Sequence, residues 1–160
     1  MGADFHKISR GGLITFHGFG QLTVYPILYL GSFKTQKSIK KYVCMLEDVI
    51  VNTGRTILKD MDDVYVSTIP GYPGVWINND RKLSAIGINC KRFVTMHGVS
   101  LNCNINLDWF EHIVPCGIEE KSVTSLSREL GQNFTVQDAT PFFLNSFKSV
   151  FKCDTIEVLG

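Results

Sequence analysis

VWINNDRKLSAIGINC, residues 75–90, decides the class of fold. The apolar run Val75 to Ile77 is followed by Asn78, Asn79 and Asp80, and a second apolar run follows from Lys82 to Cys90. Two apolar runs joined by a short polar turn predict a β-hairpin. The return strand of this hairpin begins with a lysine, so a titratable side chain is expected beside a sheet.

Further strands are expected on both sides of the hairpin. Residues 63–69 predict a short strand before the turn-forming residues 70–74, and residues 99–105 predict a neighbour of the return strand, connected to it by residues 93–98. Gln21 to Leu30 is rich in Val, Ile, Leu and Tyr and predicts a strand buried on both faces. Residues 110–117 predict an irregular loop that ends at Cys116, beside the sheet.

Two segments have helical spacing. From Ser38 onward apolar residues recur every three to four positions, and Gly54 is expected to stop this helix. Thr135 with Asp138 predicts the N-cap of a closing helix that has Pro141 in its first turn and one apolar face formed by Ala139, Phe142, Phe143, Phe147 and Phe151. No repeat or linker interrupts the chain, so residues 1–160 are expected to form one mixed α/β domain.

Composition narrows the functional classes. Hydrophobic residues make up 44% of the 160 residues, charged residues 19%, and the formal net charge is +1. A disordered tail and a nucleic-acid surface are therefore not indicated. The longest apolar run, Leu22 to Leu30, is interrupted and too short to span a membrane.

The five cysteines show wide, irregular gaps and no CxxC pair, which argues against a disulfide framework or a zinc site. Mostly buried free thiols in a reducing compartment are expected, with one of them available as a nucleophile. Cys116 is the candidate, because Pro115 and Gly117 are expected to hold it in a turn that presents its side chain. A reactive thiolate needs a nearby cation or base, and Lys82, His17 and His97 all remain candidates for that part.

Two other interpretations are disfavoured. Gly18-Phe19-Gly20 resembles the start of a dinucleotide fingerprint, but Thr23 stands where the third glycine belongs and the glycines precede a strand. Neither His17 nor His97 has a carboxylate or a second histidine at ligand spacing, so no metal site is expected.

Four clusters taken together resemble one family. They are RGGLITFHGFGQ at residues 10–21, KLSAIG at 82–87, HGVSLN at 97–102 and PCG at 115–117. In this order they resemble the octanoyltransferases, also named lipoyl(octanoyl) transferases or lipoate-protein ligase B. Residues 110–117 and 123–126 look most like the mitochondrial eukaryotic members.

The resemblance implies an acyltransferase that works through a cysteine thioester. Cys116 would form the thioester, and Lys82 would lower the pKa of that thiol and shuttle protons. No ATP, metal or other cofactor would be needed. The acyl site would be lined by Arg10, Gly11, Gly12, Leu13, Ile14, Thr15, Phe16, His17, Ala85, Ile86, Gly87, Gly98, Val99 and Ser100.

The resemblance also implies partners, location and fold. The donor would be octanoyl-acyl carrier protein, and the acceptors would be lysines of the lipoyl domains of 2-oxoacid dehydrogenase complexes and of the glycine cleavage H protein. No nucleic acid or membrane would take part. The location would be mitochondrial, and the fold that of the biotin and lipoate protein ligases, a mixed sheet with flanking helices.

Two departures from the family pattern are present. Phe19 stands where family members usually have proline, and only nine residues precede Arg10, where the family has further strands and a helix. The chain is therefore expected to be a single catalytic domain that is shortened at its N-terminus. The alternatives are a noncatalytic remnant that binds acyl groups or carrier protein, and an ATP-dependent lipoate ligase.

Overall fold

A computed structural model describes residues 2–12, 14–32, 37–113 and 121–157. Its centre is a six-stranded sheet with the order β1-β5-β4-β3-β2, in which neighbours are antiparallel and β6 pairs with β4 in parallel. The strands are β1 (Gln21–Val24), β2 (Val66–Ile69), β3 (Tyr72–Ile77), β4 (Arg81–Lys91), β5 (Val94–Asn102) and β6 (Ser122–Val123).

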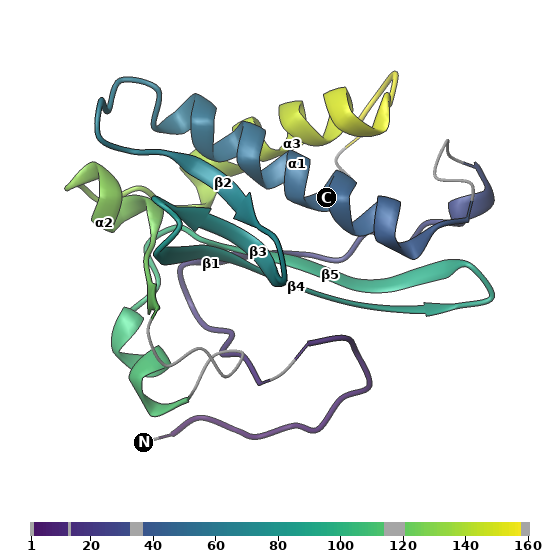
Figure 1. Cartoon of the computed structure of the whole chain (residues 1–160), viewed down its shortest axis with the longest axis horizontal. Coiled ribbons are helices and arrows are strands. Elements are labelled where there is room, and N and C mark those ends of the chain that lie inside the picture. Colours follow the sequence, from purple (N-terminus) through teal and green to yellow (C-terminus); the bar gives the residue numbers. More distant parts are fainter. Residues whose placement is uncertain (1, 13, 33–36, 114–120, 158–160) are drawn as a thin grey trace.

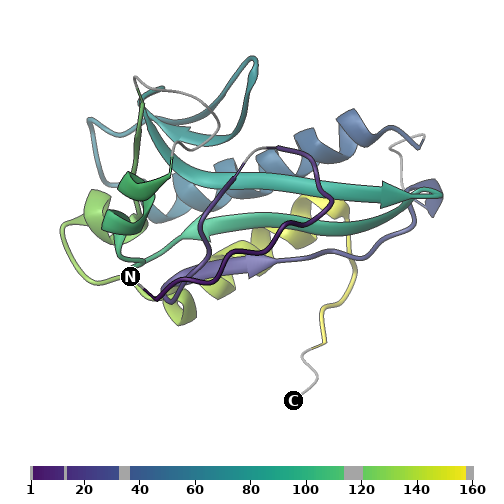
Figure 2. The same ribbon diagram turned by 90° about the horizontal axis from the view of Figure 1, so that it is seen from below.

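Helices cover one face of this sheet. The long helices α1 (Ile39–Ile57) and α3 (Val136–Phe151) lie side by side above it, whereas the N-terminal segment crosses the opposite face (Figures 1 and 2). Three short elements complete the fold: η1 (Leu30–Ser32), η2 (Leu107–His112) and α2 (Leu126–Leu130). In the described part of the chain, no helix combines the length and the apolar character that crossing a membrane requires. The expected mixed α/β class is confirmed.

The core lies between the helices and the sheet. Leu46 and Ile50 of α1 and Phe143 of α3 pack there against Leu83 and Leu101 of the central strands. All five side chains are buried. The opposite face of the sheet is thereby left to the N-terminal segment, and this is the face on which a ligand can bind.

Both expected helices form, with three corrections. Pro141 lies in the second turn of α3 and not in the first, because the helix begins at Val136. Thr135 and Asp138 make the reciprocal bonds of a capping box, as expected. Gly54 does not stop α1, which continues to Ile57. A Cβ atom at Gly54 would lie 3.0 Å from Cγ1 of Val66, so the glycine lets β2 pack closely against the helix. Phe142 is 37% exposed and stands apart from the buried face of α3.

The strand expected over residues 21–30 is wrong in length and in burial. β1 ends at Val24, and Pro26, which has no amide hydrogen for the ladder, follows two residues later. β1 is an edge strand. From Leu22 to Leu30 the even-numbered residues turn inward while Thr23, Tyr25, Ile27 and Tyr29 are exposed. One face of this segment is therefore open, rather than both being buried.

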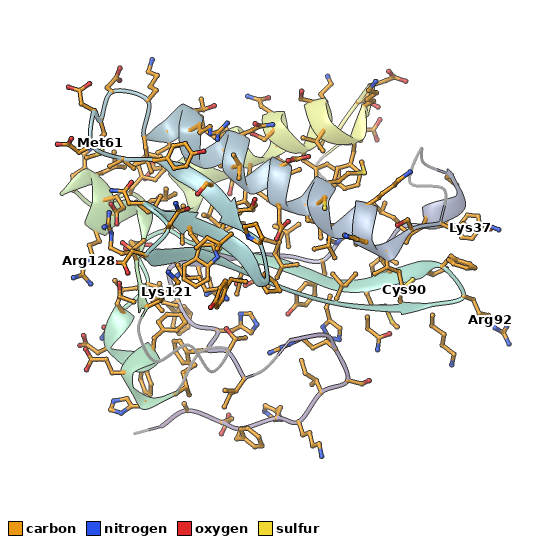
Figure 3. All side chains as sticks on the ribbon, viewed as in Figure 1. Lys37, Met61, Cys90, Arg92, Lys121 and Arg128 are labelled. Atoms are coloured by element: carbon orange, nitrogen blue, oxygen red, sulfur yellow. The ribbon has the colours of Figure 1, made fainter. Side chains whose placement is uncertain are left out.

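The β4–β5 hairpin also differs from the expectation. Residues 93–98 were expected as a connection, but β5 begins at Val94 and the turn consists of Arg92 and Phe93, with φ of 50° and 65°. Two successive positive φ values characterise the tight turn that matches the twist of a hairpin. Glycine or asparagine usually occupies such positions, so the sequence lacked the usual signal. Figure 3 shows Arg92 at the tip, with Lys37 at the same end of the molecule.

Other boundaries shift by a few residues. β2 begins at Val66, later than expected, and β3 begins at Tyr72, inside the expected 70–74 turn. β5 ends at Asn102, before the expected position 105. Part of the loop expected at 110–117 belongs to η2, and residues 114–117 lie outside the described residues.

Candidate active site

Lys82 is turned to the open face of the sheet by a β-bulge. Val75 pairs with Ser84, but the next residue, Trp76, pairs with Lys82, so Leu83 is an extra residue in β4. Without this shift, strict alternation would place Lys82 opposite Ile77, which is in the core. The bulge instead directs Leu83 into the core and Lys82 to the other face. There the Lys82 side chain is buried, with Nζ 5.1 Å from the centre of the Trp76 ring.

A cavity of about 200 Å³ lies on this open face, between the central strands and the N-terminal segment. Its walls are largely apolar, and Lys82 and His17 are among its polar residues. The full lining is Ile8, Arg10, Gly12, Thr15, His17, Tyr25, Pro73, Lys82, Ala85, Ile86, Gly87, His97, Gly98, Val99 and Ser100.

The N-terminal segment is held against the sheet by backbone contacts. The amide of Gly11 donates to the carbonyl oxygen of Ile88 at 2.8 Å, and Asn89 Nδ2 donates to the carbonyl oxygen of Ser9 at 2.7 Å. Gly87 permits this approach, because a Cβ atom there would lie 2.6 Å from Cδ of Arg10 and 2.8 Å from the carbonyl oxygen of Gly11. The glycine in the 82–87 cluster is thus explained by the segment that crosses it.

His97 occupies an unusual backbone position in the middle of β5. Its φ of 59° lies in the left-handed region, which few residues other than glycine adopt within a strand. Its ring contacts the edge of Tyr25, with ring centres 5.5 Å apart. Gly98 follows, where a Cβ atom would lie 2.3 Å from the carbonyl oxygen of Val24. The local backbone therefore places an imidazole on the cavity wall.

Two further elements meet at the Lys82 end of the cavity. β6 pairs Val123 with Lys82, and η2 is anchored by Trp109, whose ring stacks on Phe16 with the centres 5.1 Å apart. Lys121 Nζ lies 5.7 Å from the centre of the Trp76 ring, so two ammonium groups share one indole. Figure 3 shows Lys121 at this end of the sheet, opposite the hairpin tip. Positive charge is concentrated here.

One polar group on the cavity wall has no hydrogen-bond partner among the described residues. Ser100 Oγ is buried on the wall and has no hydrogen-bond partner within the described residues, nor does Ser84 Oγ, which lies outside this cavity. A buried polar group without a partner is unfavourable and marks a place where a ligand atom can bind. Within residues 2–12, 14–32, 37–113 and 121–157, no three or more histidine, cysteine, aspartate or glutamate side chains gather into a group that could hold a metal ion.

Most residues expected around the acyl group meet at this cavity. Lys82 shares it with Arg10, Gly12, Thr15, His17, Ala85, Ile86, Gly87, Gly98, Val99 and Ser100. Three others do not line it: Gly11 bonds to β4, Ile14 is 44% exposed, and Phe16 packs on η2. Leu13 and Cys116 lie outside the described residues.

Sequence reasoning did not identify Ile8, Tyr25 and Pro73 as lining residues. A signal for Tyr25 existed in the alternation of exposed and inward residues after Gln21, which places it on the open face. Ile8 and Pro73 reach the cavity only through the crossing segment and the start of β3, and no local pattern indicated either of them.

The described cysteines lie away from the cavity. Cys44, Cys90, Cys103 and Cys153 are free, and none of these four lines the cavity. Burial raises the pKa of the Cys103 thiol to about 11, which keeps it protonated at neutral pH. The expectation of mostly buried thiols is wrong within this set, because Cys44 is exposed and only Cys103 is fully buried.

Sequence comparisons show the family of the chain. A family model described as the lipoyl protein ligase A/B catalytic domain matches residues 1–148. A Danio rerio protein named mitochondrial octanoyl-acyl-carrier-protein:protein N-octanoyltransferase is 50% identical over 155 residues, covering 96% of this chain and 64% of the relative. The chain spans 58% to 65% of the length of four animal relatives.

Solved structures resemble the fold at low sequence identity. A bipartite lipoate protein ligase of Thermoplasma acidophilum matches with a TM-score of 0.65 and 13% identity, over 93% of this chain and 58% of that one. Biotin protein ligase of Aquifex aeolicus matches with a TM-score of 0.53 and 15% identity, over 83% and 53%. The expected biotin and lipoate ligase fold is confirmed.

Proposed function

The chain belongs to the family of the lipoyl protein ligase A/B catalytic domain, and from that membership we propose that it transfers an octanoyl group from octanoyl-acyl carrier protein to a lysine of a lipoyl domain. Relatives named for this reaction include those of Danio rerio and Xenopus tropicalis. The observation that carries the proposal is the position of Lys82, a buried cation at one end of a largely apolar cavity.

The cavity suits a saturated acyl chain. An octanoyl group has six methylenes and a methyl, and burial contributes about 0.8 kcal/mol for each methylene, or roughly 5 kcal/mol in total. Ala85, Ile86 and Val99 give its wall apolar surface. The unpartnered Ser100 hydroxyl supplies a hydrogen-bond donor for the thioester carbonyl.

Cys116 and Lys82 are the proposed catalytic pair. The thiolate of Cys116 attacks the carbonyl carbon of the donor thioester, and the carbon–sulfur bond to the carrier breaks with its electron pair on the leaving sulfur, which takes a proton from Lys82. A lysine amine of the lipoyl domain then attacks the enzyme thioester, the carbon–sulfur bond to Cys116 breaks with its electron pair on sulfur, and the amine proton passes to Lys82. The cations of Lys82 and Lys121, which meet over Trp76, support the thiolate form of a thiol brought to this end.

The flanks of the Cys116 stretch support this pairing. Upstream, η2 is anchored on Phe16 of the crossing segment, and downstream, β6 pairs with Lys82 itself. The acceptors that we propose are the lipoyl domains of 2-oxoacid dehydrogenase complexes and the glycine cleavage H protein. Because the animal relatives are named mitochondrial, we propose the same location for this protein.

The test is to trap the acyl-enzyme. Incubation of the chain with octanoyl-acyl carrier protein, without ATP, should give an octanoyl adduct that hydroxylamine removes and that intact mass spectrometry detects. Cys116→Ser should abolish the adduct, whereas Cys44→Ser and Cys153→Ser should retain it. An adduct that persists in Cys116→Ser contradicts the assignment. Transfer that requires ATP indicates a lipoate ligase, and a wild-type chain that binds carrier protein without acylation indicates a noncatalytic remnant.

A further inference from the structure

Two rings bound one end of the cavity. Val24 pairs with Val99, so the next residue along the chain, Tyr25, lies level with Gly98. The Tyr25 ring meets the ring of His97 edge to face, with the ring centres 5.5 Å apart and the planes at 75°. Both residues line the cavity. The two rings therefore form a wall across β5 and the segment that follows β1.

The backbone of His97 places its ring in this wall. Strict alternation along β5 would put His97 on the same face as Val99 and Leu101, both of which belong to the core. With its φ of 59°, the His97 ring instead lies on the cavity wall against Tyr25. A left-handed conformation of a residue other than glycine is unfavourable, and such conformations cluster at functional sites. The wall is therefore a feature for which the fold accepts backbone strain.

The crossing segment fills the neighbouring part of the same end. A Cβ atom at Gly87 would lie 2.6 Å from Cδ of Arg10 and 2.8 Å from the carbonyl oxygen of Gly11, so these atoms occupy the space directly over Gly87. Gly87 pairs with Gly98, the residue that lies level with Tyr25. The cavity is thus bounded at one level across β4, β5 and the segment after β1.

The distance from Ser100 to this wall matches an eight-carbon chain. The Ser100 hydroxyl is the donor proposed above for the thioester carbonyl. His97 precedes Ser100 by three residues on β5, which corresponds to about 10 Å at about 3.4 Å per residue. In an extended acyl chain, carbon–carbon bonds of about 1.5 Å advance by about 1.3 Å each, so the seven bonds from carbonyl to methyl span about 9 Å. An octanoyl group with its carbonyl at Ser100 therefore ends at the rings of His97 and Tyr25.

We propose that the Tyr25–His97 pair limits the length of the acyl chain, and that octanoyl is the longest saturated chain that fits between Ser100 and the two rings. The inference rests on the octanoyl transfer proposed above. A decanoyl chain would extend about 2.6 Å further, into the rings. Beyond the rings, Ile27 and Met96 expose apolar side chains. Removing either ring should therefore open the cavity onto an apolar surface where further methylenes can bind.

Binding of free carboxylates tests the pair without any turnover. The probes are hexanoate, octanoate, decanoate and dodecanoate, measured by isothermal titration calorimetry. Because burial of each methylene strengthens binding about fourfold, wild-type affinity should rise about 16-fold from hexanoate to octanoate and then stop rising. In Tyr25→Ala the rise should continue, so that decanoate gains about tenfold over octanoate. His97→Asn should act in the same way, because asparagine tolerates the left-handed backbone and lacks the ring.

Two variants serve as controls for these substitutions. Tyr25→Phe keeps the ring and should keep the limit at octanoate. Tyr29→Ala removes a ring that is exposed to a similar extent on the same segment, 46% against 50% for Tyr25, but that does not line the cavity. Tyr29→Ala should therefore keep the wild-type limit.

The second measurement is single-turnover acylation by carrier proteins that bear hexanoyl, octanoyl or decanoyl groups. The rate with decanoyl relative to octanoyl should rise about tenfold over the wild-type ratio in Tyr25→Ala and in His97→Asn. Tyr25→Phe and Tyr29→Ala should leave this ratio unchanged. A ratio between two donors is insensitive to the fraction of enzyme that is folded, so partial unfolding of a variant does not imitate the effect.

Three results would overturn the length limit. They are a wild-type affinity that keeps rising to dodecanoate, an unchanged limit in both Tyr25→Ala and His97→Asn, and a limit that moves as far in Tyr29→Ala as in Tyr25→Ala. If the wild-type chain binds carboxylates with the limit at octanoate but forms no acyl-enzyme with any carrier protein, the length limit is supported and the proposed transfer is wrong.

Discussion

The Lys82 ammonium nitrogen lies 5.1 Å from the centre of the Trp76 ring, the residue with which Lys82 is paired across the β3–β4 ladder. A cation–π contact of this kind attracts an ammonium group to the face of the ring. This pairing exists because the bulge at Leu83 shifts the register by one residue, and it makes Lys82 the group whose replacement should change thiol reactivity most.

Removing the Lys82 charge should slow thiolate chemistry. Lys82→Ala should slow formation of the acyl-enzyme and move the pH profile of Cys116 alkylation to higher pH, because a neighbouring cation favours the thiolate. Lys82→Arg keeps the charge and should retain more alkylation than Lys82→Ala. The test is to measure the rate of Cys116 alkylation by a small reagent from about pH 6 to about pH 9. Lys91→Ala, exposed at the hairpin end, is the control. Equal profiles for Lys82→Ala and wild type would reduce Lys82 to a structural residue.

Removing the Ser100 hydroxyl should make the protein more stable and the acylation reaction slower. Ser100→Ala deletes a buried group without a partner, so the free energy of unfolding should rise by about 1 kcal/mol while acyl-enzyme formation slows about tenfold. Ser84→Ala is the matched control, because its hydroxyl is equally unpartnered but does not line the cavity. Ser84→Ala should stabilise the protein without slowing formation of the acyl-enzyme. Thermal denaturation and single-turnover acylation test both, and a slow Ser84→Ala enzyme would argue against a specific contact at Ser100.

Adding a methyl group at Gly87 should displace the crossing segment. The new Cβ atom would lie 2.6 Å from Cδ of Arg10, and overpacking of this kind costs about 2 kcal/mol. Exchange of the residue-11 amide, which donates to Ile88, should then accelerate about tenfold or more. Gly11→Ala is the control, because its Cβ would meet only Ile88 O at 3.5 Å. Hydrogen-exchange mass spectrometry of the N-terminal peptide should show protection in Gly11→Ala and its loss in Gly87→Ala.

The Arg81–Glu129 pair should make stability depend on acid pH. Burial acts to raise the pKa of Glu129, but hydrogen bonds from Arg81 and Thr124 outweigh it, so the pKa lies below its ordinary value of 4.5. A lowered carboxyl pKa contributes stability that is present above the ordinary value and is lost as pH falls through the folded-state value. Denaturant titrations from about pH 6 to pH 3 should show this loss, and Glu129→Gln should lessen it.

At neutral pH, Glu129→Gln should lower the free energy of unfolding by about 2 kcal/mol, less than for a fully buried pair because the Arg81 side chain is 29% exposed. Glu111→Gln, on the exposed surface of η2, should change neither the neutral value nor the acid dependence. If the free energy of unfolding falls equally with acid pH in Glu129→Gln and in the wild type, other carboxylates are responsible for that fall.

Local chemistry along the chain was sufficient for several features. The helix over Val136–Phe151 follows from the Thr135 and Asp138 cap, and β4 follows from apolar residues after an Asn-Asn-Asp turn, because caps and turns depend on residues a few positions apart. The motif clusters, read in order, identified the family and ten of the residues that line the cavity with Lys82. These signals are contained in the identity and spacing of side chains.

Tertiary structure alone decided which way the decisive side chains face. Alternation within β4 would have sent Lys82 toward the core, and only pairing with β3 creates the bulge that reverses it. His97, Arg92 and Phe93 also adopt positive φ values. None of them is a glycine, so the sequence did not indicate these conformations. Hydrogen bonds also run from the His17 ring through the side chains of Gln21 and Asn102 to the backbone of Thr124. The Thr124 amide in turn donates to the carbonyl oxygen of Lys82, 65 positions after His17. Register is a property of paired strands, and a shift of one residue reverses every face, so no single strand contains that information.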